Sequence, residues 1–206
     1  MRFAVLISGL VLGAMNLAAQ QAYFPPLSFG ATGRVDWLFS EYVAHELQLL
    51  GENSFLPRAG NKSIESYRFI WLRAFDPPVS VRLDVQPDGS GVLTTKIGPG
   101  EAAFPASQHG NVQAITNTLS REEVERFRAL VTQEHFWTTP PYAFHDQQGT
   151  DGAAWIIEAT VAGTYHVTER WSPTNSIGSG KDIVRQLGIA MAFNLAKLSI
   201  PKEKIY

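Results

Sequence analysis

The stretch DGAAWIIEATVAGTYHVTERWSP, residues 151–173, decides how the fold is read. Two segments rich in aromatic and β-branched residues, 155–161 and 164–171, flank the dipeptide Ala162-Gly163. Glycine can adopt the positive φ that a two-residue hairpin turn requires. The stretch therefore predicts a β-hairpin, and Trp171-Ser172-Pro173 ends its second strand.

A two-residue turn fixes which side chains share a face of the hairpin, because residues directly opposite each other lie on the same side of a sheet. Trp155 is expected opposite Arg170, as a cation–π pair, while Ala159 faces His166 and Glu158 faces Val167. This pairing places Glu158 and His166 on opposite faces of the hairpin.

Further strands are predicted upstream of the hairpin. Residues 67–75 are aromatic and β-branched, and residues 79–85 (VSVRLDV) alternate strictly between apolar and polar side chains, as in a strand with one wet face. The run Pro87-Asp88-Gly89-Ser90-Gly91 has the composition of a tight turn, so residues 92–97 can return as an antiparallel partner.

Three helices are predicted from apolar spacing and capping residues. The first covers residues 34–50 and is stopped by Gly51. The second begins at Ser120, with Glu123 completing a capping box, and ends near Glu134. The third covers residues 180–198, with Ser179 and Asp182 as capping candidates.

This order of elements predicts an α+β fold: a single antiparallel sheet of about five strands packed against two or three helices. Residues 23–33 are expected to form a Pro/Gly linker with exposed aromatic side chains, and residues 98–118 a long loop that could act as a lid or a covering flap.

The first 22 residues predict a secretory signal peptide. Arg2 supplies the positive charge, residues 3–15 form an apolar run too short to span a bilayer, and cleavage is expected after Ala19 or Ala22. Residues 23–206 then form a single globular domain, with no transmembrane span after cleavage. The protein is expected to be exported, to a periplasm or outside the cell. Because it has no cysteine, packing alone must stabilise it.

Several segments carry a resemblance to other proteins. They are residues 67–73 with Pro78, the helix that ends at Phe136-Trp137, and above all the Asp-Gly-x-x-Trp-x-x-Glu and Tyr-His…Arg-Trp-Ser-Pro patterns within residues 151–173. Together they cover about half of the chain, and they resemble uncharacterised bacterial exported proteins of no known activity. The resemblance implies export and one small domain, and it implies no catalytic residue.

Candidate binding residues gather on the predicted hairpin: Trp155, Glu158, Tyr165, His166, Arg170 and Trp171. In one interpretation Glu158 and His166 form an acid/base pair and the tryptophans stack on a flat ligand. The interpretation that we favour makes them cross-strand pairs that fix the register of the strands. The five histidines are scattered, so neither a metal site nor a cofactor is predicted.

Three functions remain open. A non-catalytic binding module for another protein or a cell-envelope component is favoured. The alternatives are an inhibitor or immunity-type protein that presents the loop 98–118, and a small hydrolase or lyase that uses His145, Asp151, Glu158 or His166. Nucleic acid is not an expected partner, because 17 basic and 19 acidic residues are well mixed and give a net charge of −2.

Overall fold

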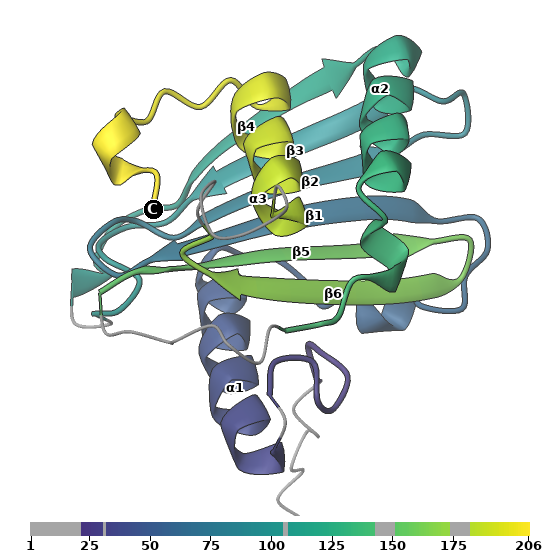
Figure 1. Cartoon of the computed structure of the whole chain (residues 1–206). Coiled ribbons are helices and arrows are strands. Elements are labelled where there is room, and N and C mark those ends of the chain that lie inside the picture. Colours follow the sequence, from purple (N-terminus) through teal and green to yellow (C-terminus); the bar gives the residue numbers. More distant parts are fainter. Residues whose placement is uncertain (1–21, 31, 105–106, 143–150, 174–181) are drawn as a thin grey trace, which may run out of the picture.

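The protein is described by a computed structural model, which places residues 22–30, 32–104, 107–142, 151–173 and 182–206. Six antiparallel strands form one sheet in the order β4-β3-β2-β1-β5-β6 (Figure 1). Their bounds are β1 Glu65–Arg73, β2 Val79–Val85, β3 Gly91–Ile97, β4 Gln113–Leu119, β5 Ala153–Val161 and β6 Thr164–Trp171. The α+β class and the single antiparallel sheet are therefore confirmed.

The β5–β6 hairpin forms as predicted. Ala162 and Gly163 make the two-residue turn with φ of 50° and 87°, which is the positive pair that a type I′ turn requires. Trp155 lies opposite Arg170, Ala159 opposite His166 and Glu158 opposite Val167. The register of this hairpin is thus set by its turn.

One strand lies where the sequence predicts loop. Residues 113–119 form β4 at the edge of the sheet, paired with β3, and six of the seven lie in the region 98–118 that was expected to be irregular. The prediction is wrong here for a physical reason. Both sides of β4 are exposed as far as Thr118, so its sequence has no buried face and no apolar alternation to reveal it.

The helices cover both faces of the sheet. Helix α1 (Gly33–Leu49) lies on one face, and α2 (Arg121–Gln133) and α3 (Ile183–Ile189) lie on the other (Figure 1). The predicted capping box of α2 is present, since Ser120 and Glu123 bond each other's backbone N–H groups. Asp182 caps α3 by accepting from the Arg185 N–H, whereas Ser179 lies outside the described residues.

Short helical turns complete the chain. The helix predicted over residues 180–198 consists of two parts in the structure: α3 ends at Ile189, and a π-helical turn follows it. The short turns are Leu56–Arg58, Phe136–Thr138, the π-helical Ala190–Leu195 and Lys202–Lys204.

Within the described ranges, no helix is both long enough and apolar enough to cross a bilayer.

Alternation along the strands produces two separate apolar layers. On β1, Phe69 and Trp71 face α2 and α3, whereas Ile70 and Leu72 face α1. Helix α3 approaches the first layer so closely that a Cβ atom at Gly188 would lie 2.8 Å from the Trp155 ring and 2.9 Å from the Phe69 ring. A glycine is needed at that contact.

Candidate functional site

Trp155 is a core residue and is fully buried. Its ring centroid lies 4.8 Å from that of Trp71 and 5.2 Å from that of Phe69, and its Nε1 donates to the carbonyl of Tyr206 at 2.7 Å. The predicted pair with Arg170 does not form, because the Arg170 guanidinium donates instead to the carbonyls of Pro140 and Glu169. Trp155 is therefore placed to stabilise the fold and offers no surface to a ligand.

Glu158 is also fully buried, on the α1 face, and it pairs with Arg68 of the neighbouring strand. Arg68 Nε donates to Glu158 Oε1 at 2.7 Å, and the Tyr165 hydroxyl donates to Oε2 at 3.0 Å. Burial raises the pKa of Glu158, while Arg68 and the Tyr165 hydroxyl act in the opposite direction. Both carboxylate oxygens thus accept from protein groups, and the fully buried side chain offers no accessible position to a substrate.

The same cluster extends to Glu52, which lies just after α1. Glu52 is buried and pairs with Arg68 at 3.2 Å, with Lys96 at 2.8 Å and with Arg82. Burial alone would raise its pKa, but these three cations outweigh burial and hold the pKa of Glu52 below its usual value. This charge cluster ties α1, β1, β2, β3 and β5 together, and each of its acids is neutralised.

His166 lies on the opposite face of the sheet from Glu158, as predicted. Its half-buried ring packs 4.9 Å from the Phe136 ring and 6.3 Å from the Trp137 ring. Its Nε2 is buried with no hydrogen-bond partner among the described residues. Burial lowers the pKa of His166, and the backbones of Phe136 and Thr139 act in the opposite direction.

The groups named for a hydrolase or lyase do not converge. Glu158 and His166 are separated by the sheet, Asp151 is exposed, and His145 lies outside the described residues. Tyr165 and Trp171 share the α1 face with Glu158 and pack against the apolar layer on that face. In the part of the chain that the structure describes, no three His, Asp or Glu side chains are grouped to hold a metal ion.

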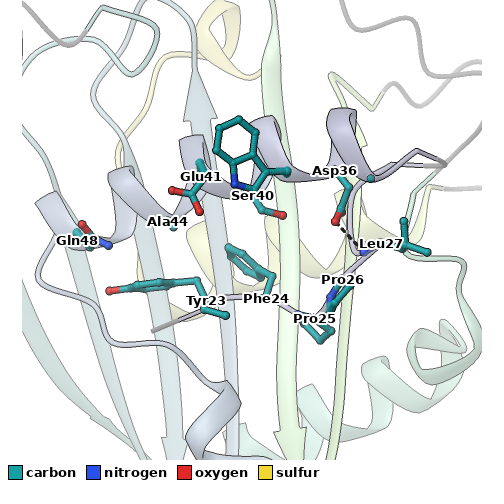
Figure 2. Close-up of a pocket in the computed structure, with 13 residues that line it drawn as sticks. Tyr23, Phe24, Pro25, Pro26, Leu27, Asp36, Ser40, Glu41, Ala44 and Gln48 are labelled. Carbon is teal, nitrogen blue, oxygen red and sulfur yellow. Dashed lines mark hydrogen bonds between the residues drawn. The ribbon is translucent and has the colours of Figure 1, made fainter. Parts of the chain in front are cut away.

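A groove lies elsewhere, between α1 and the segment 22–27 that runs beside it (Figure 2). Its volume is about 380 Å³. Figure 2 shows Tyr23 and Phe24 along one wall, opposite Ser40 and Glu41 of α1. The full lining is Ala22, Tyr23, Phe24, Pro25, Pro26, Leu27, Gly33, Asp36, Trp37, Ser40, Glu41, Ala44 and Gln48.

The groove exists because α1 presents small side chains where the segment passes. Gly33, Ser40 and Ala44 lie at helical spacing on that side of α1, so they leave space that larger residues would fill. Trp37 lies in the same wall and is 59% exposed. The Ser40 hydroxyl is buried in the wall and has no hydrogen-bond partner among the described residues.

The segment that forms the other wall is held firmly. Asp36 in the first turn of α1 accepts from the backbone N–H groups of Leu27 and Phe29, each at 2.7 Å. The Tyr23 hydroxyl donates to the Glu52 carbonyl at 2.9 Å. Because these contacts fix the segment, the groove is preformed.

Residues 23–33 were predicted to be a linker with exposed aromatic side chains, and the predicted exposure is wrong. The segment has no regular secondary structure, but Phe24 and Phe29 are 5% and 2% exposed and belong to the apolar layer on the α1 face of the sheet. The groove was therefore missed. The aromatic residues on both sides of the Pro25-Pro26 pair were a signal that this segment packs against the protein.

The chain matches no protein-family model, and a comparison with curated proteins also finds no match. The geometry of the groove is therefore the basis on which a function can be proposed.

Proposed function

We propose that the protein is exported and acts as a non-catalytic binding module, which holds an extended apolar segment of another protein in the groove between residues 22–27 and α1. Export rests on the sequence of residues 1–22, with Arg2, the apolar run 3–15 and the small residues before Ala22. Cleavage after Ala19 keeps Ala22 in the groove, whereas cleavage after Ala22 removes it and leaves the other twelve lining residues in the exported domain.

The observation that carries the proposal is the exposure of Trp37 in a preformed, mostly nonpolar groove. Nine of the thirteen lining residues are nonpolar, and Trp37 and Leu27 are 59% and 51% exposed. Large apolar side chains left in water beside a groove are typical of a surface that a partner covers. A tryptophan is also among the residues that contribute most to binding energy when a partner buries it.

The chemistry of the lining favours a polypeptide in extended form. Pro25 and Pro26 give one wall a rigid apolar surface, and the groove runs along α1 from Gly33 to Gln48. Each oxygen of the Asp36 carboxylate already accepts a backbone N–H group, so these acceptors are engaged within the protein rather than offered to a polar ligand.

A selection from random peptides tests the proposal. A phage library of twelve-residue peptides is selected against the purified protein, and the affinities of the selected peptides are measured by fluorescence polarisation. We expect apolar sequences to be enriched. Trp37→Ala removes the exposed ring and Ser40→Leu fills the groove, so each should weaken binding by at least tenfold.

Leu38→Ala is the matched control, since Leu38 is 53% exposed on the same helix and does not line the groove. Selected peptides that bind all three variants equally well would place the binding surface elsewhere. A selection that enriches no peptide over background would contradict the proposal altogether.

A further inference from the structure

The two edge strands of the sheet differ in whether another part of the chain covers them. At the β6 edge, the backbone N–H of Glu169 donates to the Pro141 carbonyl at 2.7 Å and the Thr168 hydroxyl donates to the Pro140 carbonyl at 2.8 Å. The chain before residue 142 thus covers β6. At the other edge, no strand of the described chain pairs with the outer side of β4.

The composition of β4 does not protect an open edge. Soluble proteins usually prevent edge pairing with charged side chains, proline or bulges. Each of the other five strands carries at least one charged residue, but β4 (QAITNTL) has neither charge nor proline. Its central isoleucine, Ile115, is 54% exposed.

We propose that β4 pairs with β4 of a second copy of this chain, antiparallel and about a two-fold axis through Thr116, so that two six-stranded sheets become one. The inference is independent of the groove. A two-fold interface brings the same patch of both copies together. Residues near the axis of such a pair face themselves or their close neighbours, so any charge there would meet a like charge.

The sequence of β4 meets that requirement. Full pairing of residues 113–119 places Thr116 opposite Thr116 of the partner subunit, Ile115 opposite Asn117 of the partner subunit and Ala114 opposite Thr118 of the partner subunit. None of these pairs contains a charge, and Thr–Thr pairs are favourable across strands. Because the axis is perpendicular to the sheet, α2 and α3 of both copies lie on the same side of the joined sheet. The absence of charge at β4 therefore favours a second copy over an oppositely charged partner strand.

Oligomeric state measured by sedimentation equilibrium gives the first test. We expect the purified protein to have the mass of a dimer at high concentration and to dissociate on dilution. Thr116→Lys places two like charges at the axis and should weaken the dimer at least tenfold, and Thr116→Glu should do the same. An equimolar mixture of the two variants should restore dimerisation, because each pair then joins opposite charges.

Gln133→Lys is the matched control, since Gln133 is exposed on α2 and should leave the dimer intact. Thr116 is exposed, so circular dichroism and thermal melting should show each variant folded. A monomer at all concentrations would overturn the proposal, and so would a dimer that Thr116→Lys leaves unchanged. A monomer that binds an added foreign strand peptide at β4 would replace the second copy with another partner, and would equally overturn it.

Cross-linking tests the register, because the protein contains no cysteine. Directly paired residues of antiparallel strands have Cα atoms about 4.5–5.5 Å apart, which is within the span of a disulfide. Thr116→Cys should therefore form a covalent dimer under mild oxidation, whereas Gln133→Cys should not. Equal rates of cross-linking at both positions would exclude the proposed pairing.

Discussion

Arg68 and Glu158 lie 90 residues apart in the chain, opposite each other on β1 and β5, and form an ion pair whose two side chains are completely buried. The pair lies on the α1 face of the sheet, between Glu52 and the Tyr165 hydroxyl. Taking two charges out of water is unfavourable, so the pair is sustained by the hydrogen bonds around it.

Removing one partner of this pair should destabilise the protein strongly. Arg68→Met and Glu158→Leu each leave a buried polar group without its counterpart, so we expect each to lower the free energy of unfolding by about 3–5 kcal/mol. The double variant Arg68→Met/Glu158→Leu should recover much of the loss, since Glu52 keeps Arg82 and Lys96. Urea unfolding of the three variants measures the coupling. Additive losses would show that the two residues act independently.

Glu46 should limit stability at neutral pH. It is fully buried on α1, where the Gln108 amide donates to both of its carboxylate oxygens at 3.0 Å, and burial raises its pKa. A raised folded pKa stabilises the fold at acidic pH, and this contribution is lost as pH rises from the ordinary value of about 4.5 through the folded value.

Glu46→Gln remains neutral at every pH and can still accept from Gln108. We expect its melting temperature to exceed that of the unsubstituted protein at pH 7, with the difference shrinking towards pH 4. Glu41→Gln, an exposed change on the same helix, is the control and should show no such trend. An equal difference at both pH values would rule out ionisation of Glu46 as the cause.

His166 should act in the opposite pH direction. Burial lowers its pKa below the ordinary 6.5, so the folded state resists protonation. Its contribution is present at higher pH and is lost as pH falls below about 6.5 towards the folded value. His166→Phe keeps a ring against Phe136, so the fall in melting temperature from pH 8 to pH 5 should be smaller in this variant. An unchanged fall would show that His166 does not titrate in this range.

The capping box of α2 should contribute measurably to stability. Ser120→Ala removes the acceptor for the Glu123 N–H, and the free energy of unfolding should fall by about 1 kcal/mol. Ser63→Ala, in an exposed turn, is the matched control. Chemical denaturation of both variants provides the measurement, and similar losses in the two would argue against a role for the cap.

A substitution in the β5–β6 turn should increase the stability of the protein. Ala162 has a φ of 50°, a left-handed conformation that costs a residue with a Cβ about 1 kcal/mol and that asparagine tolerates better. Ala162→Asn should therefore raise the free energy of unfolding by up to about 1 kcal/mol. Gly163→Ala should lower it, since the added Cβ would lie 3.2 Å from the Gly60 carbonyl oxygen. A destabilised Ala162→Asn variant would contradict the turn geometry.

The sequence was most informative where local chemistry decides the structure. The Ala162-Gly163 turn determined the register of the hairpin, and the Ser120–Glu123 pair marked the start of α2. In both cases the residues that carry the signal also make the contact. Such elements can be predicted because no distant part of the chain is needed to form them.

Contacts between distant residues could not be predicted in the same way. Nothing in the local pattern pairs Arg68 with Glu158 or shows that α1 and residues 52–55 cover them. Strand β4 depends on its pairing with β3, and the groove depends on how the segment 22–27 lies against α1. Each of these features depends on packing between segments that are distant in the sequence, and the pattern of residues within one segment does not show which other segment it contacts.

The hydrogen bonds from Trp71 and Trp155 to a main-chain oxygen of Tyr206 make one short segment the partner of two core indoles. Both indoles are buried in the centre of the sheet, and their shared acceptor lies 135 residues after Trp71 in the chain. When the segment 202–206 detaches from the sheet, two buried N–H groups lose their acceptor together, which is unfavourable. Docking of this segment is therefore required to satisfy the hydrogen bonding of the core.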